Sequence, residues 1–247
     1  MSDMPFVAGS AGSLLEPRAL LWLLGLGFWT GVDMTAFLQI LVSQPLAAAW
    51  LGGVAAGDPA TGLAVGLVLQ GVWSRALPMG ASPLPGVGPA SVAAGALAAS
   101  AGGGRTALAP ALTVPEAAPL AVALLVGVVL ASILRPALSA MNRRRGFVHR
   151  TAHASAAEGR PGGVVAANLF GALPSGLLGM IAVALGVGAG SVLLAATRGL
   201  SSGDGRWVAI PVLGVGLGQT ASLAGGKRVW AWIGAVLLVG GLALGVR

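Results

Sequence analysis

The sequence predicts an all-α, polytopic integral membrane protein in which several hydrophobic segments are broken or re-entrant. Hydrophobic residues make up 56% of the 247 residues, charged residues only 9%, and the mean hydropathy is +0.89; soluble domains carry about 25% charged residues. The apolar sequence is also interrupted at Gly57-Asp58-Pro59 and at Pro78-Met79-Gly80. Proline lacks its N–H and disfavours helical geometry at the preceding residue, so these breaks end helices. We therefore expect a single membrane domain, 1–247, whose broken backbone is enclosed by protein or by a water-filled cavity.

Three short apolar runs follow one another in the amino-terminal half. The first covers 19–32, the second 34–57 with Pro45 inside it, and the third 60–73. A complete span needs about 20 apolar residues. Several short segments interrupted by glycine or proline are typical of the discontinuous helices from which transporters build binding sites.

Longer apolar segments are predicted further along the chain. Residues 81–100 carry no charge and are rich in Gly, Ala and Pro, so by composition alone they read as a loop at the membrane face. A turn-rich connection follows at 102–115. The expected helices after it are 119–134 continuing towards 140, 162–197 as one kinked span or two shorter ones, 207–224 and 229–246.

Residues 141–161 form a strongly basic loop. Five arginines stand against one acid, Glu158: Arg143, Arg144, Arg145, Arg150 and Arg160. Because cytoplasmic loops are enriched in Lys and Arg, we expect this loop on the cytoplasmic side, with a phosphate or lipid-headgroup site as the alternative. His149 and His153 lie one helical turn apart here. Two histidines among arginines make a poor metal site, so we expect neither a metal nor catalysis.

The composition excludes several functional classes. The absence of cysteine excludes disulfides, thiolate metal sites and thiol nucleophiles. The formal net charge is +7, but the arginines lie at the ends of apolar runs without interleaved aromatic residues, so we expect no nucleic-acid binding. The first basic residue is Arg18, and we expect no cleaved signal peptide. The Gly-x-Gly-x-Gly motifs at 186–190 and 214–218 lie within apolar runs, and no nucleophile–base–acid set is present, so we expect no enzyme and no cofactor.

The chain contains 41 glycines, some of them spaced four residues apart, as in helices that pack closely in lipid. The spaced pairs are Gly53/Gly57, Gly62/Gly66 and Gly241/Gly245. A GC-rich genome, which inflates Ala, Gly, Val and Arg, is an equally good explanation. The composition therefore assigns a contact to no single pair.

Two of the seven acidic residues, Asp33 and Asp58, interrupt apolar sequence. An ionisable group inside a membrane segment is a functional hypothesis by default, because it is costly unless it faces a cavity or a partner. For Asp33 we favour a role in binding or in organising a site over a structural cap. Asp58 precedes Pro59 and equally suits capping of the following helix, with proline at its first position.

The stretch from Gln44 to Ala81 carries a specific pattern. It reads Gln-Pro-Leu, then Leu-x5-Gly-Asp-x2-Thr-Gly-x3-Gly, then Leu-Gln-x-Val-Trp and Leu-Pro-x-Gly-Ala, with Gly-Val-Asp upstream at 31–33. This order resembles the signature of the IIC membrane subunit of the mannose/fructose/sorbose-type sugar phosphotransferase systems. The layout of 135–185, a helix end, a basic stretch and a long apolar run, is also similar to that family.

The resemblance implies a sugar-translocating subunit that is not itself an enzyme. It would be a multi-pass protein of the bacterial inner membrane that pairs with a IID membrane subunit and forms an oligomer. Soluble IIB, charged through IIA, would phosphorylate a hexose-type sugar on the cytoplasmic side. The resemblance also implies that 31–90 forms a substrate-site unit that moves against the remainder, and that 81–100 is a re-entrant segment near the sugar path.

The resemblance also indicates which side chains would contact the sugar. A sugar presents hydroxyl groups, and carboxylates and side-chain amides bind vicinal hydroxyls through paired hydrogen bonds. The expected substrate contacts are Asp33, Gln44, Asp58 and Gln70, with Gln39 as a further group of the same kind.

Two positions depart from the family pattern. Gln70 stands where the family typically has a glutamate, Gly86 stands where an acid tends to follow, and Arg75 adds a lone positive charge nearby. A glutamine can bond hydroxyls but carries no charge and takes up no proton. The departures keep two alternatives open: a transport-inactive structural or regulatory membrane subunit, and a transporter of another small solute that does not use phosphorylation.

Overall fold

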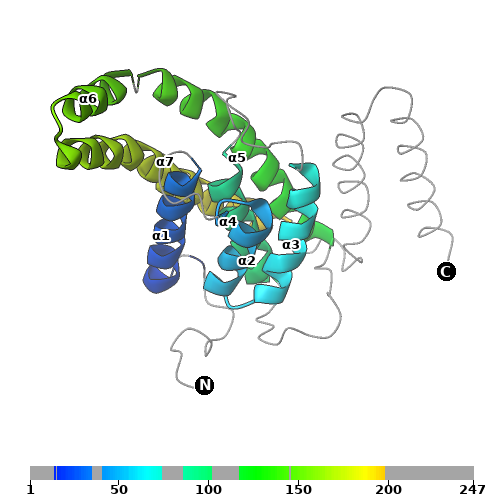
Figure 1. Cartoon of the computed structure of the whole chain (residues 1–247). Coiled ribbons are helices and arrows are strands. Elements are labelled where there is room, and N and C mark those ends of the chain that lie inside the picture. Colours follow the sequence, from blue (N-terminus) through cyan, green and yellow to red (C-terminus); the bar gives the residue numbers. More distant parts are fainter. Residues whose placement is uncertain are drawn as a thin grey trace.

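The computed structural model describes residue 14 and residues 16–34, 41–73, 86–101, 117–144 and 146–197. Within these residues the chain forms seven α-helices and no strand (Figure 1), which confirms the all-α prediction. Two of the helices, α5 (Ala117–Arg144) and α7 (Pro161–Ala196), are long and apolar enough to cross a membrane. Four predicted features lie outside the described residues: the helices at 207–224 and 229–246, the connection at 102–115 and the break at Pro78.

The three amino-terminal helices each begin at a proline. They are α1 (Pro17–Asp33), α2 (Pro45–Ala55) and α3 (Pro59–Val72). Proline suits the first helical position because its φ is already helical and an N–H there would have no helical partner. With 11 and 14 residues, α2 and α3 rise only about 17 and 21 Å, whereas the hydrocarbon core is about 30 Å thick. Neither helix can span a bilayer by itself, in agreement with the prediction of broken segments.

The break between α2 and α3 lies where the sequence predicts it. Gly57 has a φ of +84°, a left-handed conformation that glycine adopts without steric penalty. The N–H of Asp58 donates to the carbonyl of Gly53 at 2.9 Å, and α3 begins at the next residue. The chain therefore reverses direction within three residues and forms a helical hairpin.

Glycines bring the two backbones of this hairpin into contact. A Cβ atom on Gly53 would lie 2.6 Å from the Cα of Gly62, and one on Gly66 would lie 2.8 Å from the carbonyl oxygen of Leu46. Gly62 and Gly66 thus act as a packing pair of the kind used by lipid-embedded helices. A Cβ on Gly57 would meet no atom within 4 Å, so this glycine forms the turn and does not pair with Gly53 in packing.

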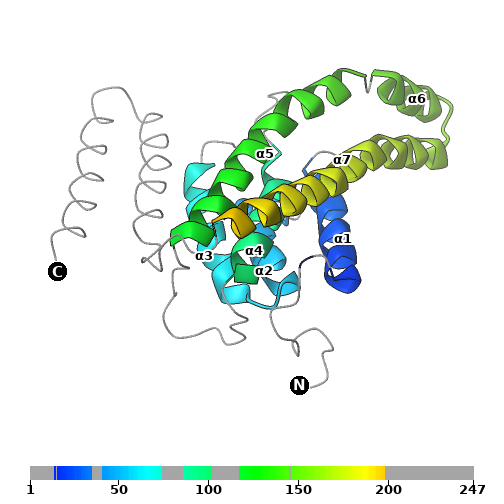
Figure 2. The same cartoon turned by 180° about the vertical axis from the view of Figure 1, so that it is seen from behind.

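α4 (Val87–Ala101) is the central helix of the described structure, as the two opposite views show (Figures 1 and 2). It contacts α1, α2, α3, α5 and α7, and nearly all its residues are buried. Of the two alternatives for 81–100, a loop at the membrane face is therefore wrong for the part that forms α4. Its small side chains let neighbouring backbones approach closely: a Cβ on Gly95 would overlap the carbonyl oxygen of Ala49 in α2.

α5 and α7 each contain a proline that does not end the helix. Pro136 lies inside α5 and Pro174 inside α7. α5 therefore continues to Arg144, and the apolar run at 162–197 is one long helix rather than two shorter ones. A 36-residue helix is about 54 Å long, so α7 exceeds the thickness of the hydrocarbon core.

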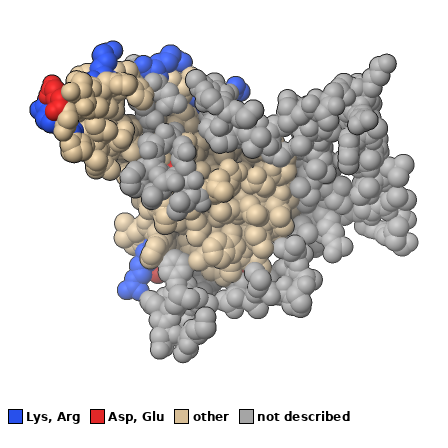
Figure 3. Space-filling view, viewed as in Figure 1, with Lys and Arg blue, Asp and Glu red and all other residues tan. Residues whose placement is uncertain are grey.

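The predicted basic loop, 141–161, is largely helical, because α5 runs into it and α6 (Gly146–Ala157) follows. No proline interrupts this stretch before Pro161, and most of its residues are compatible with a helix. α6 lies antiparallel on the first half of α7, where Val148 approaches Gly171 and Ser155 approaches Gly163. Basic side chains gather at this end of the molecule, and a broad surface without charge adjoins them (Figure 3).

Replacing Gly95 by alanine is expected to destabilise the folded chain by about 1–3 kcal/mol, because the added methyl group would overlap the backbone of Ala49. Gly25→Ala is the matched control, since a Cβ at this position in α1 would meet no atom within 4 Å and alanine favours helix over glycine. Thermal unfolding of the purified chain in detergent compares the two. Equal unfolding midpoints for the two variants would contradict the close packing of α2 on α4.

Candidate functional site

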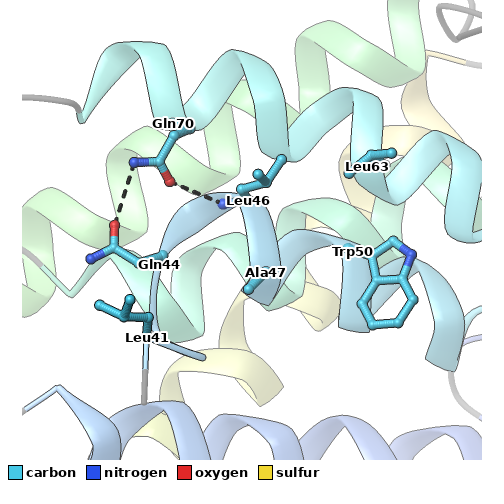
Figure 4. A pocket seen from close by; sticks show the side chains of 7 residues that line it. All are labelled: Leu41, Gln44, Leu46, Ala47, Trp50, Leu63 and Gln70. Carbon is cyan, nitrogen blue, oxygen red and sulfur yellow. Dashed lines mark hydrogen bonds between the residues drawn. The ribbon is translucent and has the colours of Figure 1, made fainter. Parts of the chain in front are cut away.

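A pocket of about 500 Å³ opens between α2 and α3 (Figure 4). Seven residues line it: Leu41, Gln44, Leu46, Ala47, Trp50, Leu63 and Gln70. The volume lies within the range of roughly 300–1,000 Å³ that is typical of small-molecule sites. All the lining residues come from the turn before α2 and from the α2–α3 hairpin, so the break in the apolar sequence creates the walls of the pocket.

Two side-chain amides meet at one end of the pocket. The Nε2 of Gln70 donates to the Oε1 of Gln44 at 3.4 Å, and the Oε1 of Gln70 accepts from the backbone N–H of Leu46 at 3.3 Å. The structure thus brings together two of the residues that the sequence predicts as sugar contacts. Figure 4 shows the Nε2 of Gln44 directed away from Gln70. Among the described residues this amide nitrogen has no hydrogen-bond acceptor, so it can donate to a ligand.

Gln70 also caps α2 from the neighbouring helix. The first backbone N–H groups of a helix have no partner within the helix, and Leu46 carries one of them. Gln44, at the cap position, makes no capping hydrogen bond with its own side chain. The amide of Gln70 takes that role across the hairpin, which couples the geometry of the pocket to the start of α2.

The rest of the pocket wall is apolar and uncharged. Trp50 has 40% of its surface exposed and presents an aromatic ring, while Leu41, Leu46, Ala47 and Leu63 supply aliphatic walls. Pockets that bind small molecules combine such apolar and aromatic walls with a few polar groups that set orientation. This arrangement suits a neutral, polyhydroxylated solute, whose hydroxyl groups the amides can bond and whose C–H groups the ring can contact.

Trp50, Leu41 and Leu63 were not predicted from the sequence as site residues. Helical spacing could have identified two of them. Leu63 lies seven residues before Gln70 and therefore on the same face of α3, and Trp50 lies four residues after Leu46 on α2. No comparable pattern indicates Leu41, which lies in the turn before α2.

Asp33 ends α1 and is buried, with 2% of its surface exposed. Its Oδ2 accepts a hydrogen bond from the backbone N–H of Ser43 at 2.9 Å. In the same turn the N–H of Gln44 donates to the carbonyl of Leu41 at 3.1 Å. Asp33 does not line the pocket; it holds the turn that delivers Gln44 to it. Of the two roles favoured for Asp33 from the sequence, binding the ligand or organising the site, the geometry suits the second.

Asp58 lies at the other end of the hairpin, where it caps α3. Its Oδ1 accepts from the backbone N–H of Thr61 at 3.0 Å, and its Oδ2 accepts from the hydroxyl of Thr61 at 2.8 Å. The residue is fully buried and is not among those that line the pocket. The structure therefore separates Asp58 from the amide pair, in keeping with the capping alternative.

The neighbourhood of Gly86 leaves no room for the acid that the family pattern suggests. The N–H of Gly86 donates to the carbonyl of Ala131 at 3.2 Å, and a Cβ at this position would lie 2.5 Å from Leu134. Any larger residue would require Leu134 in α5 to shift. Gln39 and Arg75 lie outside the described residues.

No metal centre is evident in the described part of the chain, where no three side chains of His, Cys, Asp or Glu come together. His149 and His153 are both exposed on α6. The pocket contains neither histidine nor carboxylate.

Comparison with known protein families gives a match over most of the chain. A family model described as the PTS system sorbose-specific IIC component matches residues 19–200. This range includes α1 from its third residue and the whole of the other six described helices. A comparison with curated protein sequences finds no match.

Asp58→Ala is expected to lower stability by about 1–2 kcal/mol, the usual effect of removing a helix N-cap. Asp58→Asn keeps a side-chain oxygen for the N–H of Thr61 and is expected to retain most of that stability. Thermal unfolding in detergent measures both variants. If the Asp58→Asn variant folds normally but no longer transports its solute, Asp58 contacts the ligand in addition to capping α3.

Proposed function

Because the chain belongs to the sorbose-specific IIC components of the sugar phosphotransferase system, we propose that the pocket between α2 and α3 binds the transported sugar. The chain moves a hexose-type sugar across the bacterial inner membrane, in which it is a multi-pass protein. The paired amides of Gln44 and Gln70 at an uncharged pocket carry this proposal. They offer hydrogen-bond donors and acceptors to hydroxyl groups without a charge that would demand a charged ligand.

The chemistry of phosphorylation belongs to the partners. In this proposal a IID membrane subunit completes the sugar pathway within an oligomer, and soluble IIB, charged through IIA, phosphorylates the sugar on the cytoplasmic side. The basic segment at 141–161 faces that side, because Lys and Arg are enriched in cytoplasmic segments. The present chain makes and breaks no covalent bond, and it uses no cofactor.

Alternating access would come from movement of the unit 31–90 against the remainder. This unit contains the α2–α3 hairpin and the pocket, together with the first turn of α4. The hairpin is too short to span the membrane, and transporters commonly place their sites at such discontinuous helices.

Gln70 is compatible with a sugar site even though the family resemblance suggests a glutamate there. An amide oxygen at the amino-terminal end of α2 already bonds the N–H of Leu46. A carboxylate in the same place would keep this bond, and the helix dipole would favour its negative charge. Glutamine in place of glutamate therefore removes a charge and adds a donor to Gln44, while the bond to the N–H of Leu46 is common to both residues.

A transport-inactive subunit is the second candidate, because the Gln70 amide is satisfied within the chain by Leu46 and Gln44. Such closed hydrogen bonds suit a purely structural role as well as a site awaiting its ligand. A transporter that does not use phosphorylation is the third. The three candidates differ in what accumulates: sugar phosphate for the first, nothing for the second and free sugar for the third.

The proposal is tested with membrane vesicles that contain this chain and its IID partner. Uptake of radiolabelled mannose, fructose, sorbose and N-acetylgalactosamine is measured with and without phosphorylated IIB at the cytoplasmic face. We expect accumulation of one sugar phosphate, and only when phosphorylated IIB is present. Accumulation of free sugar would support the transporter that does not use phosphorylation, and no uptake by a stable complex would support the inactive subunit.

Gln70→Leu is expected to reduce sugar affinity about tenfold, because it removes both a ligand hydrogen bond and the cap of Leu46. Gln70→Glu is the matched control, since it retains the acceptor oxygen at the same position. Equilibrium binding of the transported sugar to membranes compares the two variants, and thermal unfolding checks that each is folded. Equal binding by wild type and Gln70→Leu would remove Gln70 from the site.

A further inference from the structure

Leu41 adopts a backbone conformation that leucine rarely takes. Its φ is +67°, in the left-handed region, and no other non-glycine residue among those described has a positive φ. The β-carbon of an L-residue crowds the following carbonyl in this conformation, which is why glycine is favoured there. Strained residues of this kind persist only where the surrounding structure holds them, and they cluster at functional sites.

Leu41 also lies at the mouth of the pocket. Its side chain lines the pocket while 63% of its surface is exposed, so it borders the opening rather than the interior. Figure 4 shows Leu41 below Gln44, at the same end of the pocket as the amide pair. A bulky aliphatic side chain at this position limits what can reach the two amides.

Two consecutive backbone N–H groups, those of Ser43 and Gln44, hold the strained turn by hydrogen bonds. The N–H of Ser43 donates to the buried carboxylate of Asp33, and the N–H of Gln44 donates back to the carbonyl of Leu41. Asp33 is therefore in a position to hold the turn against the tendency of Leu41 to leave the left-handed region.

We propose that Leu41 is the specificity-determining gate residue of the pocket, held across its mouth in a left-handed turn that Asp33 secures through Ser43. This inference rests on the proposed function, since it names the residue that decides which sugar enters. Asp33 acts as a positioning residue, because it reaches the ligand only through the turn. A lipid-facing anchor is the alternative role for the exposed leucine, and the test below distinguishes the two.

The left-handed conformation of Leu41 is tested by comparing the unfolding temperatures of two variants of the full chain. Leu41→Gly is expected to unfold about 2–4 °C above Leu41→Ala, because alanine retains the left-handed strain and glycine does not. Leu21, on α1 and 69% exposed, is the matched control position. At this helical position Leu21→Ala is expected to be more stable than Leu21→Gly, because glycine weakens helices. An unfolding temperature that is higher for Leu41→Ala than for Leu41→Gly would contradict the strained turn at this position.

The role of Asp33 is tested by repeating the comparison in an Asp33→Ala background. Without the carboxylate the turn is free to leave the left-handed conformation, so the advantage of Leu41→Gly over Leu41→Ala is expected to disappear. An unchanged advantage would overturn the assignment of Asp33 as the group that holds the turn.

The gate is tested by binding of the four radiolabelled sugars to membranes that contain wild type, Leu41→Ala or Leu21→Ala. We expect Leu41→Ala to raise the affinity for N-acetylgalactosamine about tenfold relative to the affinities for the other three sugars, because its N-acetyl substituent needs a wider opening. Leu21→Ala is expected to leave these relative affinities unchanged. If wild type binds a sugar and Leu41→Ala keeps the same relative affinities, the gate assignment fails and the proposed function stands. If wild type binds none of the four, the proposed function fails and the gate fails with it.

Discussion

Direct backbone contact between helices, permitted by glycine, is the constraint on which the described structure depends. The backbones of α2 and α3 touch at Gly53 and Gly62, and the backbones of α2 and α4 touch at Ala49 and Gly95. Van der Waals packing of this kind drives association where lipid offers no hydrophobic gain. A helix as short as α2 cannot secure itself by spanning the bilayer, so these contacts fix where its first residue lies. The position of that residue determines where Gln44 and the pocket lie.

The break before α2 also places hydrogen-bonding groups at the pocket. A helix that starts inside the protein exposes backbone N–H groups that need partners, and the amide of Gln70 satisfies one of them at Leu46. The same amide meets Gln44 at the end of the pocket. Polar groups thus enter an apolar environment as a consequence of helix termination, and no buried charge is required inside the pocket. The two buried carboxylates serve the breaks themselves: Asp33 holds the turn before α2, and Asp58 caps α3.

Much of this arrangement could be predicted from the sequence, and the limits have physical causes. Proline and glycine act locally, so Gly57 and Pro59 indicated the break between α2 and α3 within a residue or two. The start of α2 at Pro45, inside the predicted apolar run 34–57, was not predicted. Asp58 could be foreseen as a cap because its partner is three residues away. The burial of α4 could not, because a run of Ala and Gly reads as a loop until close-packed neighbours are known. The partner of Asp33 lies ten residues away, and the left-handed turn at Leu41 depends on that contact, so no local pattern announces either.

The central claim is that sugar occupies the pocket between α2 and α3, and thiol protection tests it most directly. The chain has no cysteine, so Ala47→Cys introduces a single thiol in the pocket wall and Ala157→Cys a single exposed thiol on α6. Each is labelled in membranes by a water-soluble methanethiosulfonate, with and without the transported sugar. If sugar occupies this pocket, it will slow the labelling of Ala47→Cys and leave the labelling of Ala157→Cys unchanged. Equal labelling rates at position 47 with saturating sugar and without it would show that sugar does not occupy this pocket.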